Sequence, residues 1–232
     1  MENESPSPLE AAIVGYFRAP DPQTLIALFA AEPVTSRWRA ETVLTLPVFL
    51  SHLMDQAPEA ADRLIDAVKG GDPVKVEVVA QAINYSHHPR RHLLMERLAG
   101  EAAAGSMDLA GADFTLLAPT HPVHIDMLWA SFFATGQTGY VERIAVLLSG
   151  WMLQPELQAL LAVAGRDPSV RERALAGILA DSALWSLTVN GRDIPEVRQV
   201  LEGIAARQDG LTGAMAARIL AGISQPGLGA ES

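Results

Sequence analysis

The chain has 232 residues, of which 49% are hydrophobic and 19% charged, and its formal net charge at pH 7 is -10. This composition supports a sizeable buried core and excludes disorder for most of the chain. The negative charge disfavours a role on nucleic acid, and the absence of cysteine excludes disulfides, thiolate nucleophiles and cysteine-ligated metals.

The apolar runs and the first residues predict a cytoplasmic protein that does not enter a membrane. Mean hydropathy is +0.18, but no run approaches the roughly 18 to 20 uninterrupted apolar residues that a spanning helix needs. Residues 1–8 are acidic and polar, unlike a secretory or mitochondrial targeting segment. The only lysines are Lys69 and Lys75, and this arginine bias with abundant alanine indicates a GC-rich bacterial genome.

Helix starts are marked by a capping residue followed by proline. The pairs Asp21-Pro22, Asp72-Pro73 and Asp167-Pro168 each place a carboxylate before a proline that suits the first helical position. Together with apolar residues at three-four spacing, these signals predict helices of roughly 10 to 16 residues. Their predicted starts lie near residues 8, 22, 37, 47, 59, 73, 89, 122, 138, 155, 168, 194 and 212.

Two segments test this helical interpretation. Residues 74–79 alternate like a strand, but they follow Asp72-Pro73 and share a helical stripe with Ala82 and Tyr85, so we predict a helix there. Pro47 lies inside a periodic segment, where it removes one backbone hydrogen bond and predicts a break or kink near Leu46.

The fold class indicated is all-α. Short antiparallel helices joined by tight turns predict helical hairpins stacked as a short α-solenoid or an irregular two-layer bundle. Residues 167–180 resemble a HEAT-type repeat of the HEAT and armadillo families, which implies that Val170, Ala174 and Ile178 face inward and Arg171 outward. The segment 126–136 is similar to segments of uncharacterised bacterial helical proteins, and this resemblance implies no activity.

The Ala-, Gly- and Ser-rich stretch 101–119 suggests a boundary. We expect an N-terminal helical half at 1–100, a connector at 101–119, a C-terminal helical half at 120–224 and a disordered tail at 225–232.

The segment His87-His88-Pro89-Arg90-Arg91-His92 breaks a local rule, because cations oppose the positive end of the helix macrodipole. One interpretation is an anion or partner-binding site formed by His88, Arg90, Arg91 and His92. The alternative is an exposed arginine pair that bridges to acidic neighbours, of which this chain has many.

The other polar clusters give weaker evidence for a functional site. His121 and His124 are the only weak candidates for metal ligands, and Asp126 points away from them on a helix, so no metal is predicted. The alternative places these residues in a polar first turn. No phosphate loop or nucleophile motif is present, so no catalytic residue and no cofactor are predicted.

The aromatic residues divide by their expected burial. Trp129, Phe132 and Trp185 are predicted core residues, because aromatics at helical spacing usually pack inside. Trp151 follows Ser149-Gly150 near a helix end and is expected to be partly exposed, so Trp151 and Tyr140 are candidates for a ligand groove.

The sequence therefore favours a non-catalytic module that binds another protein, with a basic partner favoured by the acidic charge and a homo-oligomer as a further option. The alternative is a small-ligand or anion-binding protein or an enzyme, with a pocket between helices near 85–97 and 120–140.

Overall fold

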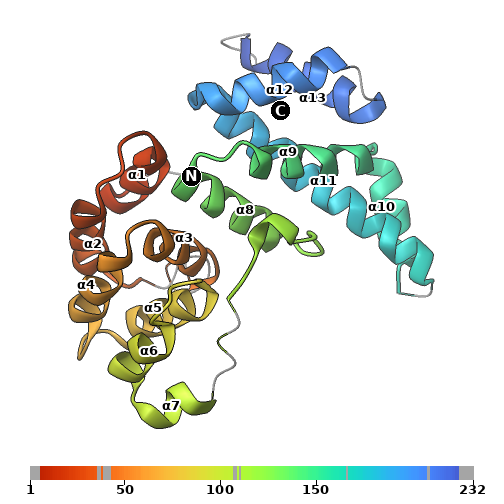
Figure 1. Cartoon of the computed structure of the whole chain (residues 1–232). Helices are drawn as coiled ribbons and strands as arrows, with labels where there is room; N and C mark the ends of the chain where they lie inside the picture. Colours follow the sequence, from red (N-terminus) through yellow and green to blue (C-terminus); the bar gives the residue numbers. More distant parts are fainter. Residues whose placement is uncertain are drawn as a thin grey trace. The chain divides into compact units, whose positions relative to one another are not determined.

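The computed structural model describes residues 6–35, 38, 43–106, 109, 111–165, 167–207 and 210–224 (Figure 1). These residues form helices, turns and loops without any strand, which confirms the predicted all-α class for this part of the chain. The tail predicted at 225–232 and the helix start predicted near residue 37 lie outside the described residues.

The chain divides into two compact units. Unit 1 comprises Met1–Leu116 and Trp129–Gly136, and unit 2 comprises Leu117–Leu128 and Gln137–Ser232. The stretch 101–119, expected to be a connector, contains a short α-helix and a 3-10 turn.

Unit 1 is built from short helices in which α3 packs against α4 and α5, while α4 also contacts α2 and α6. The helix α8, Pro122–Thr135, contributes only its second half to this unit. The other elements are α1 Pro8–Gly15, η1 Tyr16–Arg18, α2 Pro22–Ala31, α3 Val43–Gln56, α4 Pro58–Val68, α5 Pro73–Tyr85, α6 Arg91–Ala99, α7 Glu101–Ser106 and η3 Phe114–Leu116.

The core of unit 1 contains the fully buried rings of Phe29, Phe49 and Phe132. The Phe17 ring packs on Phe132 with ring centroids 4.9 Å apart. Trp129 is also buried, so the prediction of Trp129 and Phe132 as core residues is confirmed.

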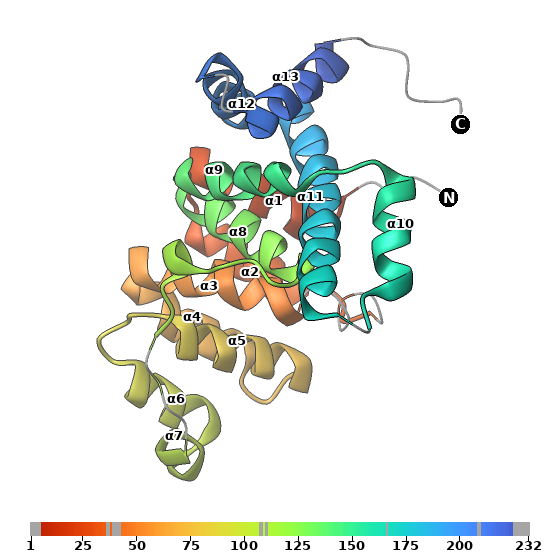
Figure 2. The same cartoon turned by 90° about the vertical axis from the view of Figure 1, so that its right-hand side faces the viewer.

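Unit 2 is organised around α11, Pro168–Asp193, which contacts α9, α10, α12, α13 and η4. Figure 2 shows α10 lying alongside α11, the helix that it contacts most within this unit. The remaining elements are the first half of α8, α9 Gly139–Val146, η4 Leu147–Gly150, α10 Gln154–Val163, α12 Pro195–Arg207 and α13 Gly210–Ser224.

The predicted caps are present as hydrogen bonds. The Asp21 carboxylate accepts from the backbone N–H of Gln23 and of Thr24, each at 3.1 Å. Asp72 and Asp167 cap α5 and α11 in the same way, each at 2.8 Å. Each cap satisfies N–H groups that the first turn of a helix leaves without a partner. The alternating segment 74–79 is accordingly helical, as predicted, within α5.

The structure corrects three local predictions. The helix α3 continues through Pro47, which lies early in the helix and removes one backbone bond there without ending it. The helix α11 has 26 residues, longer than predicted, because no breaker interrupts it after the HEAT-like segment. Trp185 is 70% exposed rather than buried, because its position on α11 faces away from the helices that cover this element.

Within α11, Ala174 is buried, Val170 and Ile178 are half-buried and Arg171 is exposed.

No single helix among the described residues is long and apolar enough to cross a membrane. One pair, Gly139–Gly150 with Gln154–Val163, reaches the required length and composition only together, and it bends by 79° at the break.

Candidate functional site

Of the two arginines of the predicted anion site, Arg90 pairs with a carboxylate of α4. Arg90, the residue before α6, donates to Asp62 at 2.6 Å. Arg97, two turns further along α6, forms ion pairs with Asp62 and with Asp66. Hydrogen bonding by the Arg90 guanidinium is the main cause that lowers the pKa of Asp62. Arg90 is therefore engaged in the exposed ion-pair network that the sequence offered as the alternative to an anion site.

His88 is a buried residue whose two ring nitrogens both form hydrogen bonds to the backbone. Its buried imidazole accepts from the backbone N–H of Arg90 at Nδ1, at 3.1 Å, and donates from Nε2 to the carbonyl of Pro58, at 3.2 Å. Since a carbonyl can only accept, these partners assign the proton to Nε2. His88 thus joins the start of α6 to the start of α4, and it does not face solvent with His92, which is exposed.

Arg91 lies near a second polar group of unit 1, the carboxylate of Asp55 on α3. The backbone N–H of His87 donates to Asp55 at 2.8 Å. Burial raises the pKa of the Asp55 carboxyl, while the hydrogen bond from the His87 backbone and the charges of His87 and Arg91 oppose this shift. The Arg91 Nε is buried without a hydrogen-bond partner among the described residues.

His52, one turn before Asp55 on α3, has a polar neighbour on α8. Its Nε2 lies 3.0 Å from the hydroxyl of Ser131. Desolvation by burial, followed by the charge of His87, lowers the pKa of His52 to about 4. The imidazole is therefore neutral at pH 7.

The two weak metal candidates act as local caps of α8. The Nδ1 atom of His121 accepts from the N–H of Val123 at 3.2 Å, and that of His124 accepts from the N–H of Thr120 at 3.1 Å. Within the described parts of the chain, no group of three or more His, Cys, Asp or Glu side chains is arranged to hold a metal ion.

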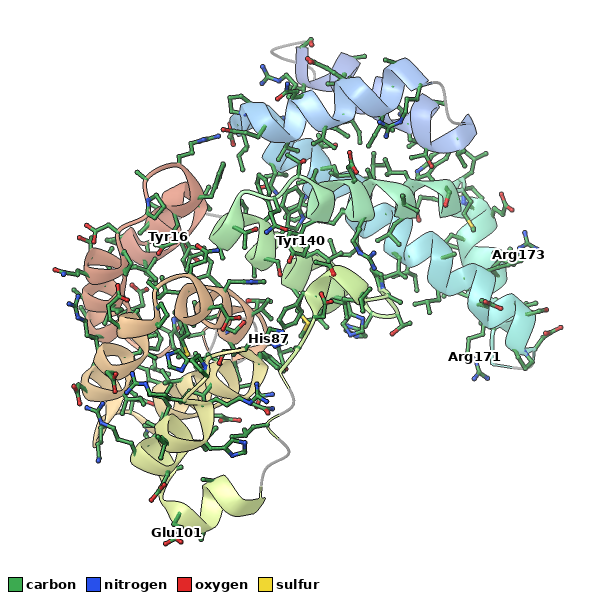
Figure 3. All side chains as sticks on the ribbon, viewed as in Figure 1. Tyr16, His87, Glu101, Tyr140, Arg171 and Arg173 are labelled. Carbon is green, nitrogen blue, oxygen red and sulfur yellow. The ribbon has the colours of Figure 1, made fainter. Side chains whose placement is uncertain are left out.

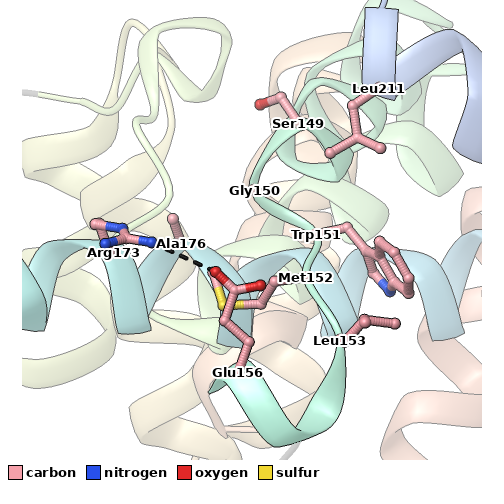
Figure 4. Close-up of a pocket in the computed structure, with 9 residues that line it drawn as sticks. All are labelled: Ser149, Gly150, Trp151, Met152, Leu153, Glu156, Arg173, Ala176 and Leu211. Carbon is pink, nitrogen blue, oxygen red and sulfur yellow. Dashed lines mark hydrogen bonds and ion pairs between the residues drawn. The ribbon is translucent and has the colours of Figure 1, made fainter. Parts of the chain in front are cut away.

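The candidate groove near Trp151 is present in unit 2, and we call it the Trp151 groove. It has a volume of about 430 Å³. Figure 4 shows Trp151, Leu153 and Leu211 on one side and the Glu156–Arg173 ion pair on another. Its lining residues are Ser149, Gly150, Trp151, Met152, Leu153, Glu156, Arg173, Ala176 and Leu211. Tyr140, the other residue proposed for a groove, is buried on α9 and is not part of this lining.

The groove forms where the chain leaves the helical conformation between η4 and α10. The 3-10 turn η4 ends at Gly150, and Trp151 and Leu153 have extended backbones before α10 begins. A Cβ on Gly150 would lie 2.7 Å from the carbonyl oxygen of Ala176 on α11, so only glycine permits this approach. The extended segment therefore holds Trp151 and Leu153 at the surface of α11 without burying them.

The groove combines apolar surface with charge. Trp151 is half-buried, as predicted, while Leu153 is 63% and Leu211 42% exposed. The guanidinium of Arg218 on α13 lies 5.3 Å from the centroid of the Trp151 ring. On α11, Arg173 (Figure 3) pairs with Glu156 at 3.4 Å, and both side chains are more than half exposed.

A second groove, in unit 1, has a volume of about 400 Å³. It lies between α2 and α4 and is lined mainly by alanines: Gln23, Ile26, Ala27, Ala30, Arg63 and Ala67. Its small side chains offer less apolar anchoring surface than Trp151, Leu153 and Leu211, so the Trp151 groove is the stronger candidate. Neither groove includes residues of the segments 85–97 or 120–140.

Sequence reasoning found Trp151 but missed Leu153, Leu211, Arg173 and Arg218. The break at Ser149-Gly150 with Pro155 soon after was a signal that Leu153 lies in a loop. No sequence pattern near Trp151 or Arg218 indicates that these two side chains meet.

No protein-family model, curated protein or solved structure matches this chain significantly.

Proposed function

We propose that this chain is a protein-binding helical module of the HEAT or armadillo kind, that it acts without catalysis in the cytoplasm, and that the Trp151 groove is its docking site. The occupant is an apolar segment of a partner protein.

The observation that carries this proposal is the uncovered apolar surface around α10. Of the ten residues of α10, only Leu157 is fully buried, although the helix contains three leucines and one charged residue. Helices with this composition normally pack on more than one side. The groove presents Trp151, Leu153 and Leu211, and α10, which contributes Glu156 to its lining, leaves Leu161 and Val163 exposed outside it. Exposed apolar surface of this extent is of the kind that anchors a partner.

The net charge of the chain acts on the approach of a partner protein, before the two proteins are in contact. The formal charge of -10 favours the approach of a basic protein and disfavours nucleic acid. The groove combines apolar side chains with the Glu156–Arg173 ion pair, as protein interfaces combine apolar and charged groups.

The test is a selection of random twelve-residue peptides displayed on phage against the full-length chain. The groove variant is Leu153→Ser with Leu211→Ser, which removes apolar surface without adding charge. Leu153 is the residue before α10, where serine is a good helix cap, so this variant should fold. Trp185→Ala is the matched control, because it removes an exposed apolar side chain of unit 2 that does not line the groove.

We expect enriched peptides that bind wild type and Trp185→Ala equally and bind the groove variant at least about tenfold more weakly. Circular dichroism should confirm that all three proteins are folded. Enrichment of no peptide over a bare surface, or equal binding to the folded groove variant, would overturn the proposal.

A further inference from the structure

The charged groups at the Trp151 groove do not follow the charge of the whole chain. Arg173 and Glu156 line the groove as an ion pair, and the guanidinium of Arg218 lies over the ring of Trp151, which also lines it. The chain has 27 acidic and 17 basic residues, yet these charged groups comprise two arginines and one carboxylate.

Arg218 is arranged to receive an acceptor. It is exposed on α13, its guanidinium lies over the Trp151 ring, and it forms no ion pair with a carboxylate among the described residues. A guanidinium that stacks on an aromatic face keeps its N–H donors at the edge, where they match the two oxygens of a carboxylate. Stacking also limits the freedom of the side chain, so less entropy is lost when a partner binds.

Arg173 is only loosely held. Its contact with Glu156 is a single one at 3.4 Å, and the side chains are 63% and 52% exposed. Exposed pairs of this kind contribute little to stability, so either partner can turn to a new ligand.

We infer that the segment that occupies the Trp151 groove carries an Asp or Glu next to its apolar anchor, with the apolar side chain against Trp151, Leu153 and Leu211 and the carboxylate on Arg218 and Arg173. This inference rests on the proposed function. It names the chemistry of the partner segment at that same groove.

The distance over which charges interact in solution decides whether the segment in the groove is acidic or basic. At physiological ionic strength, charges separated by more than about 8 Å are largely screened. The net charge of -10 therefore acts on the encounter of whole proteins, while the residue inside the groove responds to the groups that line it. A lysine beside Trp151 would meet the like charge of Arg218, whereas a carboxylate there would meet an opposite charge.

The experiment starts from the peptides selected on the full-length wild-type chain. The tightest peptide is synthesised in two forms, one as selected and one with each Asp or Glu changed to Asn or Gln. Both forms are titrated by fluorescence anisotropy into wild type, Arg218→Gln, Arg173→Gln, Glu156→Gln and the control Arg192→Gln. Arg192 is exposed at the end of α11 and does not line the groove, so its variant loses an equal charge elsewhere in unit 2.

We expect selected peptides to be enriched in Asp or Glu beside an apolar residue. Arg218→Gln should weaken binding of the acidic form about tenfold and change binding of the amide form less than about twofold, as for loss of a charged hydrogen bond. Arg192→Gln should leave both constants unchanged. The effects of the Arg218 change and of the peptide change should be less than additive, because both remove the same contact.

The outcomes separate this inference from the proposed function. Peptides that depend on Leu153 and Leu211 but are apolar or basic, and that bind Arg218→Gln and Arg173→Gln as tightly as wild type, would overturn the acidic segment and leave the docking site in place. A loss of binding confined to Glu156→Gln would likewise replace the acidic segment with a basic one. Failure of the groove variant to weaken any peptide would overturn both.

Discussion

The buried imidazole of His52 makes the stability of unit 1 depend on pH. His52 lies on α3 with its Nε2 at 3.0 Å from the Ser131 hydroxyl, and burial lowers its pKa to about 4. In the unfolded chain its pKa returns to the ordinary histidine value of 6.5. As pH falls, the unfolded chain therefore binds this proton first, and folding becomes less favourable.

The sign and size of the effect follow from the two pKa values. The contribution is fully present above about pH 6.5 and is lost as pH falls toward 4, and each pKa unit corresponds to about 1.4 kcal/mol. The free energy of unfolding should drop by about 2 kcal/mol at pH 5 and about 3 kcal/mol at pH 4 from this group. Protonation of Asp55, whose pKa is raised mainly by burial, favours the folded state and offsets part of the loss at the acid end.

The assay is urea unfolding of wild type, His52→Gln and the control His92→Gln at several values between pH 4.5 and 7.5. Glutamine keeps an amide within reach of Ser131 and does not titrate. We expect His52→Gln to lose most of the decrease in unfolding free energy below pH 6.5, while His92→Gln, altered at an exposed position, keeps it. Equal pH dependence of His52→Gln and wild type, or an NMR titration of His52 near pH 6.5, would refute this reasoning.

Five further substitutions test the packing, each by its urea midpoint. His88→Ala removes a buried acceptor and a buried donor that join α6 to α4, and it should destabilise the chain by about 2 to 4 kcal/mol; a change under 1 kcal/mol would contradict the assigned contacts. Phe132→Ala should cost about 3 to 5 kcal/mol, whereas Trp185→Ala should cost less than about 0.5 kcal/mol, and the reverse order would exchange the core and surface assignments. Gly150→Ala should destabilise the chain by about 1 to 3 kcal/mol through the clash with the carbonyl of α11. Gly203→Ala, with open space at its Cβ inside α12, should stabilise it by about 0.5 to 1 kcal/mol, and a stabilising Gly150→Ala would show that the loop is not held against α11.

Local chemistry made the helices predictable. A carboxylate such as Asp21 caps a helix that begins at the next residue, so the signal and its structural consequence lie within one turn. The same reasoning identified the helix at 74–79 despite its alternating pattern, because Asp72-Pro73 precedes it. It overestimated the effect of Pro47, since a single missing bond early in a helix is tolerated.

Tertiary arrangement was less accessible from the sequence. Trp185 and Trp129 have similar apolar spacing, but only the placement of other helices decides which ring is covered, and Trp185 is left exposed. Of the residues that form the Trp151 groove, the sequence identified only Trp151. Its other charged and apolar members come from α10, α11 and α13, and no local pattern relates Arg218 to a tryptophan 67 residues earlier.

Hydrogen–deuterium exchange of the full-length chain, with and without a saturating selected peptide, tests the docking site most directly. The account predicts slower exchange in the segment 149–161 and in the start of α13 near Leu211, with no change in the α2–α4 groove of unit 1. Exchange of the Leu153→Ser, Leu211→Ser variant should not respond to the same peptide. Protection confined to unit 1, or to the exposed face of α11 around Trp185, would contradict the assignment of the Trp151 groove as the binding site.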